Sequence, residues 1–482
     1  MKQTVKRNPK APRQRPGLLP METRLACHDE VCQGLTLEQV ETEALRCLNC
    51  KHAACVDACP LHVDIKGFIA SLTEGDLMTA FQSITRSNPF PGICGRVCQH
   101  EVFCEKACLL GKKREPVAIG LLERFVADHQ PSPSGPMEHA RRLPEGPRVA
   151  LVGSGPASLM AAYELNRLGY RVTVFEALHR LGGVLSYGIP PFRLPPDVIE
   201  GEIARLDQLG VEFATNFLVG NTATIDELFD QGYKAVFLGA GAGLPYLLKI
   251  PGENLVGVYT ANEFLTRTNL MRAYDFPVEG TPVIVGNRTI VIGGGNSALD
   301  AARWARRFGS ETTVVFRRGR AELRARAEEV ELAEQEGVRF EFLAAPVRFL
   351  GDAEGRIREV ECIRMRLDKP DGSGRPSPVP IAASEYRIPV DTAIVAVGQA
   401  PNPTLQRATP QLLTRNGRIV VDELGKTNLP GVYAGGDVVR GGSTVVLAML
   451  DGHAAALAID RALRCEPGHG KAIAEQPEEK QR

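Results

Sequence analysis

The sequence has no excess of charge of either sign and no apolar run long enough to cross a membrane. Lys and Arg together number 57, and so do Asp and Glu, which gives a formal net charge of zero at pH 7. Proteins that bind nucleic acid usually need a strongly basic face, so this balance argues against that class. The longest apolar stretch, residues 235–248, is too short to span a bilayer and is broken by Gly and Pro. Because the N-terminus also lacks the apolar run of a secretory signal, we expect a cytosolic protein with neither a membrane nor nucleic acid as partner.

Cysteine is absent from residues 109–361, although the chain contains 12 cysteines. Ten of them lie in the segment from Cys27 to Cys108, and the other two, Cys362 and Cys465, stand alone. In a reducing cytosol such a dense group indicates metal ligation or redox chemistry rather than disulfides. The N-terminal part of the chain is therefore interpreted as a region that binds a metal or a cluster.

A Pro-, Ser- and Gly-rich linker, residues 130–147, separates this cysteine-rich, helical region from a part with a different pattern. From residue 148 a short apolar strand runs into a helix of small residues and then into a second strand. The same pattern returns from Thr289. A strand, a glycine-rich turn and a helix in this order are typical of dinucleotide-binding units, so we expect two such units in an α/β protein.

The first unit carries the fingerprint Gly153-x-Gly155-x-x-Ser158, with Glu176 at the end of the following strand. Gly153 permits the tight turn, Gly155 lets the backbone approach a pyrophosphate, and the small Ser158 allows the helix to pack closely on the strand. The Glu176 carboxylate can accept hydrogen bonds from both ribose hydroxyls, which requires an unphosphorylated ribose. The pattern therefore predicts FAD or NAD in the first unit.

The second unit carries Gly293-x-Gly295-x-x-Ala298, and arginines stand where the first unit has its acid. Guanidinium groups bind a 2′-phosphate with charge-assisted hydrogen bonds, whereas an acid would repel it. We therefore predict an NADPH site, with NADH use left open; the alternative is a solvated basic strand end. The candidate contacts are Gly293, Gly295, Asn296, Arg317, Arg318, Arg324 and Arg326.

The N-terminal cysteines include two groups of four, Cys47-x2-Cys50-x4-Cys55-x3-Cys59 and Cys94-x3-Cys98-x5-Cys104-x3-Cys108. Pro60 follows the first group directly, as in the cysteine runs of bacterial ferredoxins, although the inner spacing of four differs from theirs. Zinc sites usually combine two short-spaced pairs instead. We therefore favour two [4Fe–4S] clusters, with zinc as the alternative.

The two dinucleotide units and a late Gly-Gly-Asp turn, at Gly436 and Asp437, resemble the glutathione-reductase-like flavoproteins. In that fold the NAD(P) domain is inserted into the FAD domain. Disulfide reductases of this fold need a cysteine pair beside the flavin, and the cysteine-free segment makes that chemistry untenable here. Over residues 25–465, strings such as CLNCKHAACVDACPLHVDI, NPFPGICGRVCQHEVFCEKAC and YAGGDVV resemble a narrower family, the small (beta) subunit of NADPH-dependent glutamate synthase. The same module occurs in the bifurcating NADH-dependent reduced ferredoxin:NADP oxidoreductase and in dihydropyrimidine dehydrogenase.

This resemblance implies an organisation for the whole chain. A helical domain with two [4Fe–4S] clusters would occupy residues 1–146, the FAD domain 147–285 and 393–470, the NADPH domain 286–392, and a tail 471–482. Cys47, Cys50, Cys55 and Cys108 would hold one cluster, and Cys59, Cys98, Cys104 and Glu123 the other. The alternative for Glu123 is a solvated helix position. Cys94 would be structural, and Cys27, Cys32, Cys362 and Cys465 would do no chemistry. Gly183 and Arg193, within a segment (181–195) that resembles the flavin-covering loop, are candidate FAD contacts.

The implied activity is oxidation of NADPH, with electrons passing through FAD and the clusters to a partner subunit or acceptor. Hydride transfer demands no acid or base, so no catalytic residue is nominated. Glutamate synthesis would need an amidotransferase and an FMN barrel, for which this chain has no room, so a separate large subunit or another electron acceptor is implied. The alternatives are the large subunit of an electron-bifurcating transhydrogenase, which would bind a second flavoprotein, and a zinc-held, nucleotide-sensing interaction protein.

Overall fold

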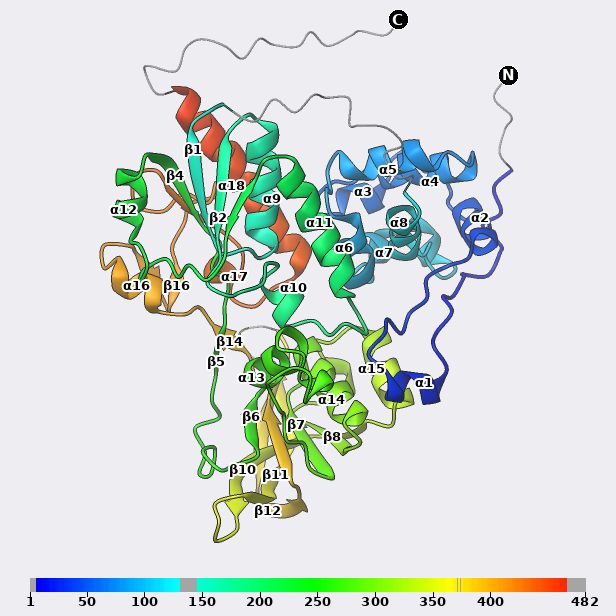
Figure 1. Cartoon of the computed structure of the whole chain (residues 1–482). Coiled ribbons are helices and arrows are strands. Elements are labelled where there is room, and N and C mark those ends of the chain that lie inside the picture. Colours follow the sequence, from blue (N-terminus) through cyan, green and yellow to red (C-terminus); the bar gives the residue numbers. More distant parts are fainter. Residues whose placement is uncertain (1–5, 131–144, 371, 373, 466–482) are drawn as a thin grey trace, which may run out of the picture.

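The computed structural model describes residues 6–130, 145–370, 372 and 374–465. Figure 1 shows three parts: a helical region at the N-terminal end, a first parallel sheet beside it, and a second parallel sheet below both. The expected tail and most of the expected linker lie outside the described residues. The predicted class, an α/β protein with a helical N-terminal region and two Rossmann-like units, is confirmed.

The helical region is assembled from short helices around one buried helix, α8. Its elements are α2 (Leu37–Leu45), α3 (Ala54–Asp57), α4 (Ile65–Thr73), α5 (Leu77–Thr85), α6 (Pro91–Val97), α7 (Cys104–Ala107), the 3-10 turn η1 (Leu109–Lys112) and α8 (Ile119–Asp128). Helix α1 (Met21–Ala26) precedes them in the chain and lies against the second parallel sheet's helices instead. Thr36 fixes the start of α2 through a capping box with Gln39. Helix α6 packs so closely on α8 that a Cβ added to Gly95 would lie 2.7 Å from the backbone nitrogen of Arg124.

The first unit is a five-stranded parallel sheet in the order β17-β4-β1-β2-β3. Its strands are β1 (Arg148–Val152), β2 (Arg171–Phe175), β3 (Glu212–Ala214), β4 (Tyr233–Leu238) and β17 (Val432–Ala434), and its helices are α9 (Pro156–Arg167), α10 (Val184–Tyr187), α11 (Pro196–Gln208), α12 (Ile225–Asp230), α16 (Thr404–Ala408), α17 (Asp437–Arg440) and α18 (Val445–Cys465). The central strand β1 is almost fully buried, as expected for a parallel sheet covered on both faces.

Helices α9 and α18 touch through a glycine, and this contact gives a prediction for stability. A Cβ at Gly452 would lie 2.0 Å from the backbone oxygen of Ala157. Gly452→Ala should therefore push the helices apart and destabilise the fold by about 1–3 kcal/mol, lowering the melting temperature. Gly201→Ala on α11 is the matched control, because its Cβ would meet open space and alanine favours a helix. Equal stability of the two variants would contradict the prediction.

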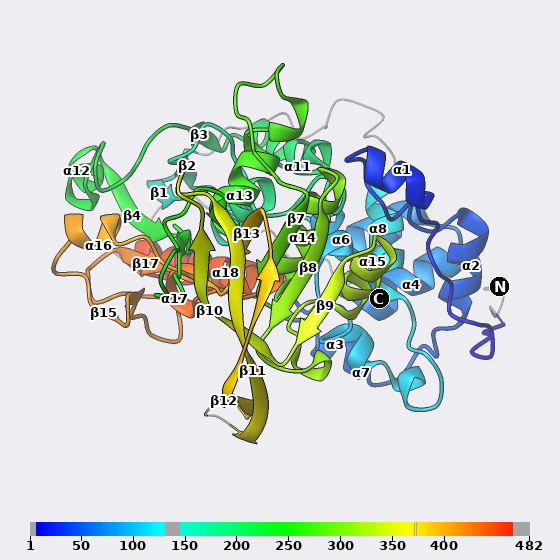
Figure 2. The same cartoon turned by 90° about the horizontal axis from the view of Figure 1, so that it is seen from below.

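The second unit is another five-stranded parallel sheet, in the order β6-β13-β7-β8-β9. Its strands are β6 (Val258–Thr260), β7 (Arg288–Ile292), β8 (Glu311–Phe316), β9 (Arg339–Phe342) and β13 (Thr392–Val395), and its helices include α13 (Ala261–Leu265), α14 (Asn296–Arg307) and α15 (Ala327–Gln335). Figure 2 shows the antiparallel sheet that projects from this unit, formed by β10 (Ala344–Gly351), β11 (Ile357–Pro370) and β12 (Pro376–Pro389).

The second sheet differs in extent from the range 286–392 expected for this unit. Strand β6 comes from residues before it, and β13 lies across the expected boundary at 392/393, because Val258 pairs with Ala393. A three-residue strand has no readable periodicity, which explains why β6 was not predicted.

Shorter elements connect these parts. They are β5 (Leu244–Pro245), β14 (Gln399–Ala400), β15 (Thr414–Arg415), β16 (Arg418–Ile419), the π-turn η2 (Thr266–Leu270) and the 3-10 turns η3 (Ala273–Asp275) and η4 (Arg320–Glu322). Among the described residues, none of the helices combines the length and apolar character needed to cross a bilayer.

Candidate functional site

The glycine turn of the first unit lies at the carboxyl end of the central strand β1, where ligands bind in open parallel sheets. Gly153 has φ +89°, and a Cβ there would lie 2.7 Å from the backbone oxygen of Gly239. A Cβ on Gly155 would meet open space, so the backbone is accessible at that residue. Ser158 is fully buried. A Cβ on Gly239 would lie 2.2 Å from its Oγ, so helix and sheet pack closely there.

Glu176 lies beside this turn at the end of β2, with 6% of its surface exposed. Its carboxylate accepts hydrogen bonds from the backbone nitrogen of Ser154 (2.9 Å), the Ser154 hydroxyl (2.5 Å) and the nitrogen of Leu178 (2.8 Å). Gly183 approaches the same turn, because its Cβ would lie 2.8 Å from the Cα of Gly155. The structure thus brings together four of the residues predicted to contact FAD: Gly153, Gly155, Glu176 and Gly183.

The Gly-Gly-Asp turn adjoins the start of α9. A Cβ on Gly436 would lie 3.1 Å from that of Ala157, and Asp437 begins α17. Asp437 accepts hydrogen bonds from the nitrogen (3.0 Å) and hydroxyl (2.8 Å) of Ser443, while burial raises the pKa of its carboxyl group. Tyr187 lies among these acids: burial and the charges of Asp437 and Glu176 raise its pKa to about 12. The position of Tyr187 in this site could not be predicted from the sequence, since Glu176 and Asp437 are more than ten residues away from it in the chain.

The glycine turn of the second unit follows β7 in the same way. Gly293 has φ +151°, and a Cβ there would lie 2.3 Å from the oxygen of Ala396. Gly295 again faces open space. The Oδ1 atom of Asn296 accepts a hydrogen bond from the nitrogen of Arg326 (3.0 Å), and the oxygen of Gly294 accepts one from the nitrogen of Arg324 (2.8 Å). The segment carrying the predicted arginines is therefore bound directly to the turn.

The four predicted arginines have different surroundings. Arg317 and Arg324 are exposed. Arg318 is 4% exposed and donates from Nε to the backbone oxygen of Pro376. Arg326 turns its guanidinium group toward the helical region. Arg317 and Arg324 are thus the two that reach solvent beside the turn.

This difference predicts which arginines select NADPH. A charged hydrogen bond contributes about 1.5–3 kcal/mol, so the double variant Arg317→Ala, Arg324→Ala, which removes two of them, should lose at least about 100-fold in kcat/KM for NADPH. The value for NADH should change less than about threefold, because NADH has no 2′-phosphate. Arg320→Ala is the control, since Arg320 is on the same segment as Arg317 and Arg324 but forms an ion pair with Glu334. Equal losses with both nucleotides would contradict the assignment.

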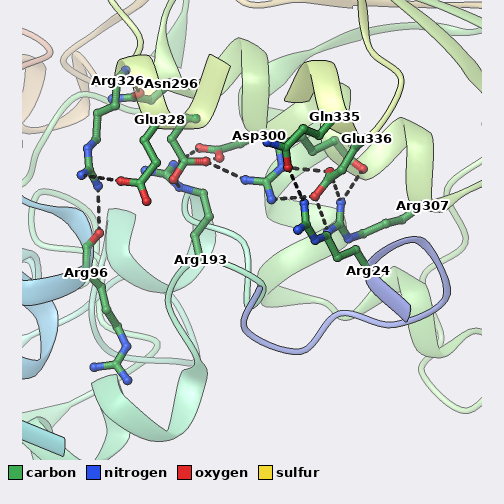
Figure 3. Close-up of polar contacts among 12 residues, drawn as sticks. Arg24, Arg96, Arg193, Asn296, Asp300, Arg307, Arg326, Glu328, Gln335 and Glu336 are labelled. Carbon is green, nitrogen blue, oxygen red and sulfur yellow. Dashed lines mark hydrogen bonds and ion pairs between the residues drawn. The ribbon is translucent and has the colours of Figure 1, made fainter. Parts of the chain in front are cut away.

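Arg193, a candidate FAD contact, is 6% exposed in its side chain and reaches into the second unit. Its Nη1 lies 2.8 Å from Asp300 on α14, and its Nε lies 2.9 Å from Glu329 on α15 (Figure 3). The structure therefore gives Arg193 a position between the two nucleotide units. No sequence pattern signalled it, because Asp300 lies 107 residues away.

The cysteines line two cavities. The first is lined by Cys47, Cys50, Cys55 and Cys108, together with apolar side chains and Lys66. We call it the distal cavity, because its wall includes no residue of the first nucleotide unit. The second, the proximal cavity, is lined by Cys59, Cys94, Cys98, Cys104, Asn88, His100 and Glu123. Each group of ligands that the resemblance implied shares one cavity, and Cys94 lines the proximal cavity as well. Within the described ranges, no three His, Cys, Asp or Glu side chains are placed to hold a single metal ion.

Glu123 is held in the wall of the proximal cavity rather than in solvent. It is 7% exposed, accepts a hydrogen bond from Asn88 Nδ2 (2.7 Å) and lies 3.4 Å from His100 Nε2. Cys94 also has a partner, because its Sγ lies 3.7 Å from the sulfur of Met449 on α18. Asn88 and His100 were not predicted from the sequence, because only the fold brings them to Glu123.

Burial raises the pKa values of Cys47 and Cys55 in the distal cavity and of Cys98 and Cys104 in the proximal cavity. The pKa of Cys55 rises to about 11, and those of Cys98 and Cys104 rise well above the usual thiol value. A buried thiolate is costly without a positive partner, and the iron of a cluster supplies one. The chemistry of these donors therefore fits iron–sulfur ligation.

The proximal cavity is shared between two parts of the protein. Val446 of α18, the helix that follows the Gly-Gly-Asp turn, forms part of its wall. Ile65 and Ile119 line both cavities and separate them. The distal cavity opens beside Leu48 and Leu109, which are 43% and 37% exposed.

Two family models match the chain. One, dihydropyrimidine dehydrogenase domain II with a 4Fe-4S cluster, matches residues 24–134. The other, pyridine nucleotide-disulphide oxidoreductase, matches residues 147–452. Among solved structures, Mycobacterium tuberculosis FprA in complex with NADPH is similar to 66% of this chain and 85% of its own, with a TM-score of 0.55 and 22% identity. That likeness supports the fold.

Curated relatives match over most of the chain. The glutamate synthase [NADPH] small chain of Halomonas elongata is 33% identical over 92% of this chain and 95% of its own length. The NADP(+)-dependent formate dehydrogenase subunit beta of Moorella thermoacetica is 38% identical over 86% of this chain, which spans 60% of that relative. The NADPH-Fe(3+) oxidoreductase subunit beta of Geobacter sulfurreducens is 34% identical, and the chain spans 63% of it.

These matches confirm the predicted enzyme class, an NAD(P)H-dependent oxidoreductase with an iron–sulfur domain and a flavin- and nicotinamide-binding domain. They also confirm the resemblance drawn from the cysteine strings and the glycine turns. The chain belongs to the pyridine nucleotide-disulphide oxidoreductases, in the family of the NADPH-dependent glutamate synthase small chain.

Proposed function

We propose that this chain oxidises NADPH and delivers the electrons singly, through FAD and two [4Fe–4S] clusters, to a separate protein in the cytosol. The observation that carries the proposal is the shared wall of the proximal cavity. Val446 in that wall belongs to the first nucleotide unit, which we call the flavin-type unit, and Cys98 belongs to the helical region. When bound, FAD accepts a hydride and releases single electrons, and each cluster takes up one electron.

The chain's own residues hold these groups in a defined order. Gly153, Gly155, Ser158, Glu176, Gly183 and the Gly436–Asp437 turn would hold FAD, and Gly293, Gly295, Asn296, Arg317 and Arg324 would hold NADPH. Cys59, Cys98, Cys104 and Glu123 would hold the cluster nearer the flavin. Cys47, Cys50, Cys55 and Cys108 would hold the outer one, because their cavity shares only Ile65 and Ile119 with the proximal cavity.

The surface beside the distal cavity is the proposed exit for electrons. Leu48 and Leu109 are exposed there, and Lys51, Lys112 and Lys113 are exposed next to them in the chain. An apolar centre with basic neighbours suits an acidic protein surface, which would also speed association. Two relatives are named as beta subunits and one as a small chain, which supports a partner subunit.

The cofactors can be tested on the purified chain under anaerobic conditions. The proposal predicts about eight iron atoms per chain, flavin and iron–sulfur absorbance, and bleaching of both by NADPH. Four iron atoms would reject the second cluster. A colourless protein containing zinc would reject the proposal in favour of a zinc-held, nucleotide-sensing interaction protein.

The partner can be tested by affinity purification from native cells. A large glutamine-dependent subunit would identify a glutamate synthase, which we favour because that small chain matches over 95% of its length. A small flavoprotein with a [2Fe–2S] centre would identify the bifurcating transhydrogenase instead. Electron transfer from NADPH to the purified partner would then be measured directly.

A further inference from the structure

Arg326 belongs to the second nucleotide unit, but its side chain enters the helical region. Its backbone nitrogen donates to Asn296 Oδ1 in the glycine turn (3.0 Å). Its Nη1 donates to the backbone oxygen of Arg96 (3.0 Å; Figure 3). Its Nε lies 3.1 Å from Glu101. The side chain is only 11% exposed. Arg326 therefore connects the glycine turn of the second unit with the segment that carries Cys98.

The two contacts of Arg326 flank a residue of the proximal cavity. Arg96 precedes Cys98 by two residues, and Glu101 follows it by three. Cys98 itself lines the proximal cavity, and the guanidinium group of Arg326 lies against the backbone of the same short segment. The charge of Arg326 is thus placed beside the segment that supplies Cys98 to the cavity.

We propose that Arg326 is a positioning residue that raises the reduction potential of the cluster in the proximal cavity. The inference rests on the proposed function, since it needs a cluster held by Cys59, Cys98 and Cys104. Reduction adds one negative charge to a buried centre, and a nearby cation stabilises the reduced form. Without the cation, Glu101 and Glu328, which pair with it, would oppose that added charge.

The charge of Arg326 is held in place from both sides. Its backbone is fixed by the turn through Asn296, and the neighbouring Arg324 is fixed by Gly294. The side chain is fixed by the carbonyl of Arg96. The second unit thereby contributes a fixed cation to a centre whose ligands all come from the helical region.

The test is a redox titration of the full-length holoprotein, followed by electron paramagnetic resonance. Arg326→Gln should make one of the two cluster couples harder to reduce, with about a tenfold change in its reduced-to-oxidised ratio at fixed potential, or 59 mV for one electron. The reduction potential of the other cluster should not change. Arg326→Lys should restore most of the potential. Arg320→Gln, which breaks an exposed ion pair on the same segment, should leave both reduction potentials unchanged.

Two further variants decide the case if Arg326→Gln does not fold. Glu101→Gln removes the opposing charge and should make the same couple easier to reduce. Lys66→Gln, in the wall of the distal cavity, should make the other couple harder to reduce and so assign the two signals.

The outcomes separate this inference from the proposed function. If Arg326→Gln and Glu101→Gln leave the reduction potentials of both clusters unchanged, the inference is overturned and the proposed function still stands. An equal shift of both couples would also overturn it, because a general structural change would then be the cause. A protein without two cluster couples would overturn the proposed function itself.

Discussion

Replacing Cys98 with serine is expected to abolish electron delivery from NADPH to a protein acceptor, while the flavin still reduces a two-electron acceptor. Cys98 is buried in the wall of the proximal cavity, between the flavin-type unit and the distal cavity. Loss of outer contacts to a metal site already costs 10–100-fold, so loss of a ligand should cost about 100-fold or more. The rates with the two kinds of acceptor, and the iron content, measure the effect.

The control for this variant is Cys94→Ala. Cys94 is equally buried and lines the same cavity, but its sulfur contacts Met449 and it is outside the proposed ligand set. The alanine variant should keep both clusters and most of the electron delivery. If Cys94→Ala loses a cluster and Cys98→Ser keeps both, the ligand assignment in this cavity is wrong.

Arg303→Met is expected to lower the free energy of unfolding by about 3–5 kcal/mol. The guanidinium of Arg303 is fully buried between Glu329 (2.6 Å) and Glu336 (2.8 Å). Methionine fills much of the same volume but leaves buried carboxylates with less compensating charge. Denaturant unfolding measures the loss. Arg320→Gln, which breaks an exposed ion pair, should cost less than about 1 kcal/mol.

The same group of charges predicts how stability depends on pH. Burial alone would raise the pKa of Glu329, but the guanidiniums of Arg193, Arg303 and Arg326 lower it to about 2. The pKa in the folded state is thus below that in the unfolded chain, about 4.3. The contribution of Glu329 is therefore present above about pH 4.3 and is lost as the pH falls toward 2. A Glu329→Gln variant should lack this component of the acid transition.

Local patterns in the sequence predicted the local features of the sites. Gly153 and Gly293 were identified by spacing alone, and both have the positive φ and close backbone approach that glycine permits. Glu176 was placed correctly beside its turn, because the length of a helix and a strand fixes its distance along the chain. Motifs of this kind are encoded within about 25 residues and are readable without the fold.

Long-range contacts were not predictable in this way. Arg193 was assigned to the flavin from its neighbours in the chain, whereas its ion-pair partners are on α14 and α15. Arg326 was grouped with the other arginines, but it contacts Arg96, 230 residues away. A charged side chain reveals its partner only when the fold is known, since periodicity reports which face is buried and not what covers it.

The order of the strands in the first sheet has a consequence for synthesis of the protein. Strand β17 pairs with β4, although almost 200 residues, including the whole second unit, separate them in the chain. Helix α18, which packs on α9 and supplies Val446 to the proximal cavity, follows still later. A ribosome therefore releases a second unit whose strands are all available before the first sheet can be completed. The apolar surface of α9 and the proximal cavity stay uncovered until α18 emerges, and exposed apolar surface favours aggregation during that interval.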